Sequence, residues 1–266
     1  MINRHRTISV TLAALALAVL AAAVPPAPAR AGQQPGFTGL LDYSQAWYDL
    51  YTRHNDPIDE YNDANYMELY ALTDVNIPFI ASHEYEELNP KHADGRFEGS
   101  LPYSGYAAFV DQAGTVIDFG FQFEKTWDGN SIAEQKGDAV QERGRLDLAA
   151  GHMTDERAIL RGDVTIERDT YEYKLTAEGA AVALAVWGDV YTYQGDEMNR
   201  TQAVYMRLTE SGMEFVMASA SLGVAFEPVS LGGGEMTPEE AVQALEAAGF
   251  TIQVRGGVRD GALTLQ

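Results

Sequence analysis

The spacing of apolar residues changes along the chain and divides it into three stretches after the first 31 residues. Apolar positions recur every three to four residues in 32–94, mostly every second residue in 95–231, and in both patterns in 232–266. The first spacing is typical of one face of a helix and the second of a strand with one buried face. Because helices precede a run of strands, the pattern predicts an α+β fold within one compact domain, 32–266.

The stretch 32–94, which is rich in tyrosine and acid, predicts two amphipathic helices. Their apolar faces would be formed by Leu40, Tyr43, Trp47, Leu50 and Tyr51, and by Ile58, Tyr61, Asn65, Leu69 and Leu72. Asn55 is a capping residue and Pro57 suits a first helical turn, so the second helix is expected to begin there. We expect these N-terminal helices to pack on one face of a sheet.

The stretch 95–231 predicts a twisted, mostly antiparallel β-sheet meander. Alternation is clearest where Ile117, Phe119, Phe121 and Phe123 are separated by polar residues or glycine. Short glycine-containing turns separate the candidate strands, and parallel pairing would need crossovers of a dozen or more residues. We expect about seven to nine strands. The run from Ala180 to Trp187 is apolar at every position, so it predicts a central strand covered on both faces.

The last stretch, 232–266, predicts a glycine linker and a small helix-strand-strand unit. Thr237, Pro238 and Glu240 provide a cap, a first-turn proline and the glutamate of a capping box, and Gly249 suits the end of the helix. A unit of about thirty residues is too small to be stable alone, so we expect it to dock on the main sheet.

The first 31 residues are not expected to be part of the folded domain, and their pattern predicts a cleaved secretory signal peptide. They contain Arg4 and Arg6 but no acid, an apolar run over 12–24, and small residues ending at Ala31. The run is too short for a membrane span, which needs about 20 residues. We therefore expect a soluble exported protein, secreted or, if the source has two membranes, periplasmic, and not an integral membrane protein after signal cleavage.

The charge of the chain limits its partners. There are 39 Asp and Glu against 18 Lys and Arg, a net charge of -21, and removal of the signal with its three arginines deepens this to -24. Nucleic acid is excluded as an ordinary partner, because phosphate affinity comes from lysine and arginine. The chain has no cysteine, which excludes disulfides, thiolate catalysis and thiolate metal sites.

Asp56, Glu60 and Asp63 form the first candidate metal site. On a helix these three acids would line one side within about two turns, and carboxylate oxygens suit calcium. The segment lacks the spacing of an EF-hand loop, and a solvated acidic face is the simpler interpretation. The sequence therefore predicts no cofactor unless calcium binds here.

His83, Glu84 and Glu87 form a second, less favoured candidate metal site. The segment begins like the zinc-binding pattern H-E-x-x-H, but Glu87 stands where the second histidine would be. An acidic surface turn is the interpretation that we favour.

No sequence pattern identifies a catalytic residue. A nucleophile elbow, a phosphate-binding loop and a dinucleotide fingerprint are all lacking. The sequence therefore favours a non-enzymatic binding protein whose partner is a small apolar ligand, a glycan or another protein. The alternatives are a secreted carbohydrate-directed hydrolase that uses two carboxylates, one with a raised pKa, and a calcium-dependent surface protein.

Overall fold

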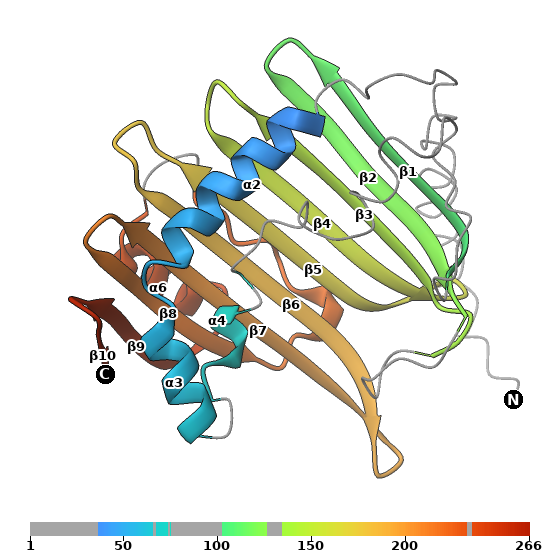
Figure 1. Cartoon of the computed structure of the whole chain (residues 1–266). Coiled ribbons are helices and arrows are strands. Elements are labelled where there is room, and N and C mark those ends of the chain that lie inside the picture. Colours follow the sequence, from blue (N-terminus) through green and yellow to red (C-terminus); the bar gives the residue numbers. More distant parts are fainter. Residues whose placement is uncertain (1–36, 66–67, 74, 76–102, 127–134, 233–235) are drawn as a thin grey trace, which may run out of the picture.

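A single sheet of ten antiparallel strands forms the centre of the protein (Figure 1). The computed structural model describes residues 37–65, 68–73, 75, 103–126, 135–232 and 236–266. The strands lie side by side in chain order. They are β1 (Tyr103–Ala113), β2 (Val116–Lys125), β3 (Ala139–Asp147), β4 (His152–Arg161), β5 (Val164–Leu175), β6 (Ala181–Tyr193), β7 (Asp196–Thr209), β8 (Gly212–Ala220), β9 (Thr251–Arg259) and β10 (Ala262–Leu265). The predicted antiparallel meander is confirmed.

Helix α2 (Phe37–Tyr51) crosses one face of the sheet, which we call the inner face (Figure 1). The ring of Trp47 packs edge-on against Tyr173 of β5, with centroids 5.1 Å apart, and the Tyr43 hydroxyl donates to the Gly151 carbonyl at 3.2 Å. The whole predicted apolar face of this helix is buried. Burial of these large side chains against the sheet, rather than helix propensity, supplies most of the stability of such a helix.

The second predicted helix is two shorter ones, α3 (Asp56–Ala64) and α4 (Tyr70–Thr73). The buried side chain of Asn62 accepts a hydrogen bond from the Leu69 backbone N–H at 2.7 Å, and the Asn65 side chain donates to the Tyr61 carbonyl. These side-chain bonds to the backbone compete with helix continuation. Helix α3 begins after Asn55 with Pro57 in its first turn, as predicted, but Asn55 has helical torsion angles and its side chain makes no capping hydrogen bond.

The opposite, outer face is covered over β6 to β8 by the chain that follows β8. The 3-10 helix η2 (Gly223–Ala225), the extended segment 226–231 and helix α6 (Pro238–Ala247) bury Phe226, Leu231 and Leu245 there. The Tyr205 hydroxyl donates to the Met236 carbonyl. The capping box of Thr237 and Glu240 is present as predicted.

Strand β6 lies at the centre of the sheet, and residues 181–186 are buried on both faces, as their continuous apolar run predicted. Strand β9 pairs with β8, and β10 with β9, so the C-terminal residues extend the same sheet. The sheet is therefore larger than the expected seven to nine strands. Within the described ranges, no helix combines the length and the apolar character needed to cross a membrane.

Candidate functional site

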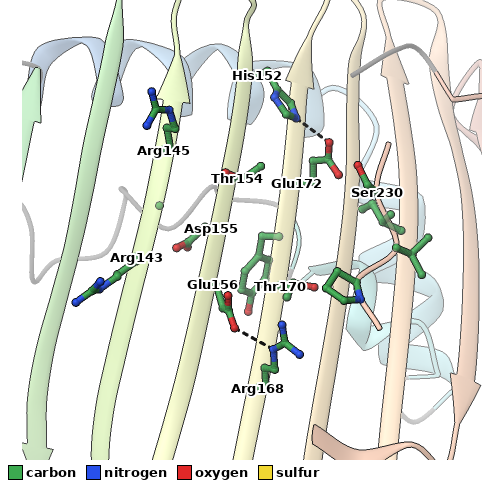
Figure 2. Close-up of a pocket in the computed structure, with 15 residues that line it drawn as sticks. Arg143, Arg145, His152, Thr154, Asp155, Glu156, Arg168, Thr170, Glu172 and Ser230 are labelled. Carbon is green, nitrogen blue, oxygen red and sulfur yellow. Dashed lines mark hydrogen bonds and ion pairs between the residues drawn. The ribbon is translucent and has the colours of Figure 1, made fainter. Parts of the chain in front are cut away.

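A groove of about 480 Å³ lies on the outer face, where the cover over β6 to β8 ends (Figure 2). Its floor is formed by β3, β4 and β5, and one wall by Pro228, Val229 and Ser230. Successive side chains of a strand point to opposite faces, so alternate polar residues of these three strands share the groove. Cross-strand pairing aligns Arg145 with Thr154.

Three arginines, Arg143, Arg145 and Arg168, reach this groove. Nη1 of Arg145 donates to Asp118 at 3.2 Å. Nε of Arg168 donates to Glu156 at 2.9 Å, and its Nη1 donates to the Phe226 carbonyl at 3.3 Å. These bonds fix the positions of the Arg145 and Arg168 guanidinium groups while using only some of the five N–H donors of each.

His152 and Glu172 connect the floor of the groove to its wall. Nε2 of His152 lies 2.7 Å from Oε1 of Glu172, and Oε2 of Glu172 accepts the Leu231 backbone N–H at 2.8 Å. Figure 2 shows this pair beside Ser230. The carboxylate of Glu172 therefore holds the segment 226–231 against the strands, which gives the groove a fixed shape.

A second group of polar residues lies on the inner face and is buried. Asp155 of β4 and Asp169 of β5 are only 4% and 2% exposed. Burial raises the pKa of Asp155 to about 8, and the Glu156 backbone N–H and the Arg157 charge lower it only in part. Burial also raises the pKa of Asp169, with a further contribution from Glu167. These two buried acids lie on the inner face, whereas the acids Glu156 and Glu172 line the groove.

The three acids of α3 that were proposed from the sequence as metal ligands belong to neither group. Asp56, Glu60 and Asp63 are exposed on α3. His83, Glu84 and Glu87 lie outside the described residues. Among the residues that are described, no three His, Asp or Glu side chains converge closely enough to hold a metal ion. Calcium binding at α3 stays a prediction, which the effect of calcium on the melting temperature would test.

Neither the groove nor the buried acids were singled out from the sequence. For the buried acids a signal was available, because Met153 and Ile159 mark the apolar face of β4, and Asp155 and Arg157 occupy the positions between them. Charged residues at such positions are rarely buried unless they are paired or functional. The groove had no comparable signal, because its residues occupy the polar positions of ordinary alternating strands.

No family model, no curated protein and no solved structure matches this chain. The geometry of the groove and of the buried acids is therefore the basis for the functional argument.

Proposed function

We propose that the protein is an exported, non-enzymatic binding protein and that its ligand is a small polar molecule carrying a carboxylate or phosphate group. The observation that carries this proposal is that three arginines line one walled groove, in a chain whose net charge is -21. Export is supported by the signal-like residues 1–31.

The groove offers the donors that an oxyanion requires. Guanidinium groups bind carboxylate and phosphate through charge-assisted hydrogen bonds, which are stronger than those between neutral groups. Thr154, Thr170 and Ser230 add hydroxyl groups to the same lining. The groove volume lies within the range of about 300 to 1,000 Å³ that is usual for small-molecule sites.

The structure favours this ligand over an apolar one held between helix and sheet. In the described part of the inner face, Trp47, Leu50 and Tyr173 fill the contact between α2 and the strands. Asp155 and Asp169, the two buried carboxylates, are almost fully covered. The acids that line the groove, Glu156 and Glu172, are already hydrogen-bonded to Arg168 and His152, and this arrangement supports binding better than catalysis.

The proposal is tested by NMR titration of the isotope-labelled mature protein with succinate, inorganic phosphate and, as a neutral polar control, glucose. We expect succinate or phosphate to shift the amide signals of residues 143–145, 152–156 and 168–172. Arg145→Gln is expected to weaken this binding roughly tenfold, because one charge-assisted hydrogen bond is worth about 1.5 to 3 kcal/mol.

Arg259→Gln is the matched control, since it removes the same charge from an exposed position on β9. The proposal is wrong if glucose shifts these signals as strongly as the anions do. It is also wrong if the two arginine variants weaken binding equally, because the anions would then respond only to overall charge.

A further inference from the structure

The groove on the outer face has an apolar side as well as a charged one. Pro228 and Val229 belong to its wall, and Leu184 of β6 adds to the apolar lining. Pro228 is exposed and Val229 is half-buried, so the wall keeps apolar surface in contact with solvent. Figure 2 shows Arg143 and Arg145 on β3, on the side of the groove away from this wall. A ligand that fills the groove therefore meets charge on one side and apolar carbon on the other.

The wall is held in place from β5 at both of its ends. Nη1 of Arg168 donates to the Phe226 carbonyl at 3.3 Å, and the guanidinium carbon lies 5.2 Å from the centroid of the Phe226 ring. At the other end, Oε2 of Glu172 accepts the Leu231 backbone N–H at 2.8 Å. The side chains of Phe226 and Leu231 are buried. A wall that is fixed before the ligand arrives loses little conformational freedom on binding, which favours affinity.

The charges that line the groove favour a ligand with a single negative charge. Glu156 and Glu172 lie among the lining residues, whereas the side chain of Asp155 is on the inner face. With histidine counted as neutral, three arginines against two glutamates leave an excess of one positive charge. A phosphate monoester carries about -1.5 to -2 near neutral pH, whereas a carboxylate carries one negative charge. A carboxylate therefore matches the lining better than a phosphate does.

From these contacts we propose that the ligand of the groove is a monocarboxylate with a short aliphatic chain. This inference rests on the proposed function and names the class of its ligand. The carboxylate lies over β4, between the arginines of β3 and Arg168, where Thr154 offers a hydroxyl donor. The chain packs against Pro228 and Val229. Two strand spacings, roughly 10 Å, separate β4 from β6, and a chain of about six carbons with bonds of about 1.5 Å covers most of this distance.

Contact with the wall makes the affinity depend on chain length. Complete burial of one CH₂ group raises an affinity by about fourfold. Acetate and hexanoate differ by four CH₂ groups, but the groove is open to solvent, so the chain is only partly buried. We therefore expect hexanoate to bind at least about tenfold more tightly than acetate.

The test is NMR titration of the isotope-labelled protein with acetate, butyrate and hexanoate, and with 1-hexanol as the neutral ligand of the same length. The amide signals of residues 168–172 and 229–231 and the methyl signals of Val229 report binding. We expect the affinity to rise from acetate through butyrate to hexanoate, and 1-hexanol not to bind. A nuclear Overhauser effect between the terminal methyl group of hexanoate and the methyl groups of Val229 should show the orientation of the chain.

A pair of matched variants makes the result specific to the wall. Val229→Thr keeps the shape of the side chain but adds a hydroxyl group, so it should lower the affinity for hexanoate about threefold and leave that for acetate unchanged. Val164→Thr makes the same substitution at a position on β5 that is 63% exposed and outside the groove, and it should change neither affinity. Pro228→Ser, at an exposed position of the wall, serves if Val229→Thr does not fold.

Failure of this inference is distinguishable from failure of the proposed function. If acetate, butyrate and hexanoate bind equally well, the chain does not contact the wall, and the inference is overturned while the proposed function stands. The same conclusion follows if folded Val229→Thr and Pro228→Ser both bind hexanoate as tightly as Val164→Thr does. If 1-hexanol binds as well as hexanoate, or if neither carboxylates nor phosphate bind, the proposed function fails and this inference fails with it.

Discussion

Asp138 shows how a single ion pair decides the behaviour of a buried acid in this protein. It lies just before β3 with its side chain 2% exposed, and it accepts hydrogen bonds from Nε and Nη2 of Arg161, each at 3.0 Å, and from the Gln135 N–H at 2.6 Å. Burial, the largest single effect, would raise its pKa, but the hydrogen bonds from Arg161 and Gln135 and the charges of Arg161 and Lys125 together keep the pKa below the ordinary value. Asp155, which has no such partner, is shifted in the opposite direction.

We therefore predict that Asp138→Asn lowers the free energy of unfolding by about 1 to 3 kcal/mol at neutral pH. A lowered folded-state pKa contributes stability that is fully present above the unfolded value of about 4 and is lost as the pH falls through the folded value. Urea unfolding of both proteins from neutral to acid pH should show the difference shrinking. Asp118→Asn, which removes an exposed partner of Arg145, should cost no more than about 0.5 kcal/mol. A difference that grows toward acid pH would contradict the assignment.

At the scale of elements, the boundaries that depend on local chemistry were predictable and those that depend on tertiary contacts were not. The apolar spacing located α2, and the alternation located β2, because each pattern is a property of one segment. The break between α3 and α4 depends on Asn62, whose buried hydrogen bond to Leu69 no periodicity reveals. The groove depends on the register that aligns Arg145 with Thr154 and on Glu172 holding Leu231, and these are pairings between distant segments.

Helix α6 gives an element-scale prediction, because its start was defined by local sequence alone. The Thr237 hydroxyl accepts the Glu240 N–H, and the Glu240 carboxylate accepts the Thr237 N–H at 2.8 Å. Thr237→Ala should lower the free energy of unfolding by about 1 kcal/mol, because it leaves an N-terminal N–H group without its acceptor. Thr237→Ser should retain most of the stability. The midpoint of urea unfolding measures both, and equal losses in the two variants would show that the threonine methyl group, not its hydroxyl, is important.

At the scale of the whole molecule, lowering the pH has two opposite effects on the stability of the folded protein, one through the excess of acid and one through the internal ion pairs. Lowering the pH relieves repulsion among surface carboxylates, but it also protonates Asp138 and releases Arg161. The net charge of -21 is carried on a chain in which several arginines, including Arg161, Arg168 and Arg200, are engaged in ion pairs with acids. The excess negative charge is therefore carried mainly by acids outside these ion pairs. Added salt screens the repulsion between these acids without protonating the acids of the ion pairs, so it tests the repulsion more directly than a change of pH.

We predict that added salt stabilises the protein. Like charges destabilise the compact state by self-repulsion, and the Debye length falls from about 30 Å at 0.01 M salt to about 8 Å at 0.15 M and about 3 Å at 1 M. The melting temperature of the protein should rise steeply up to about 0.2 M sodium chloride and then level off. Sodium and potassium chloride should act alike, because screening depends on ionic strength and not on the cation. A flat or falling melting temperature would mean that the folded protein gains more from its ion pairs than it loses to the excess of acid.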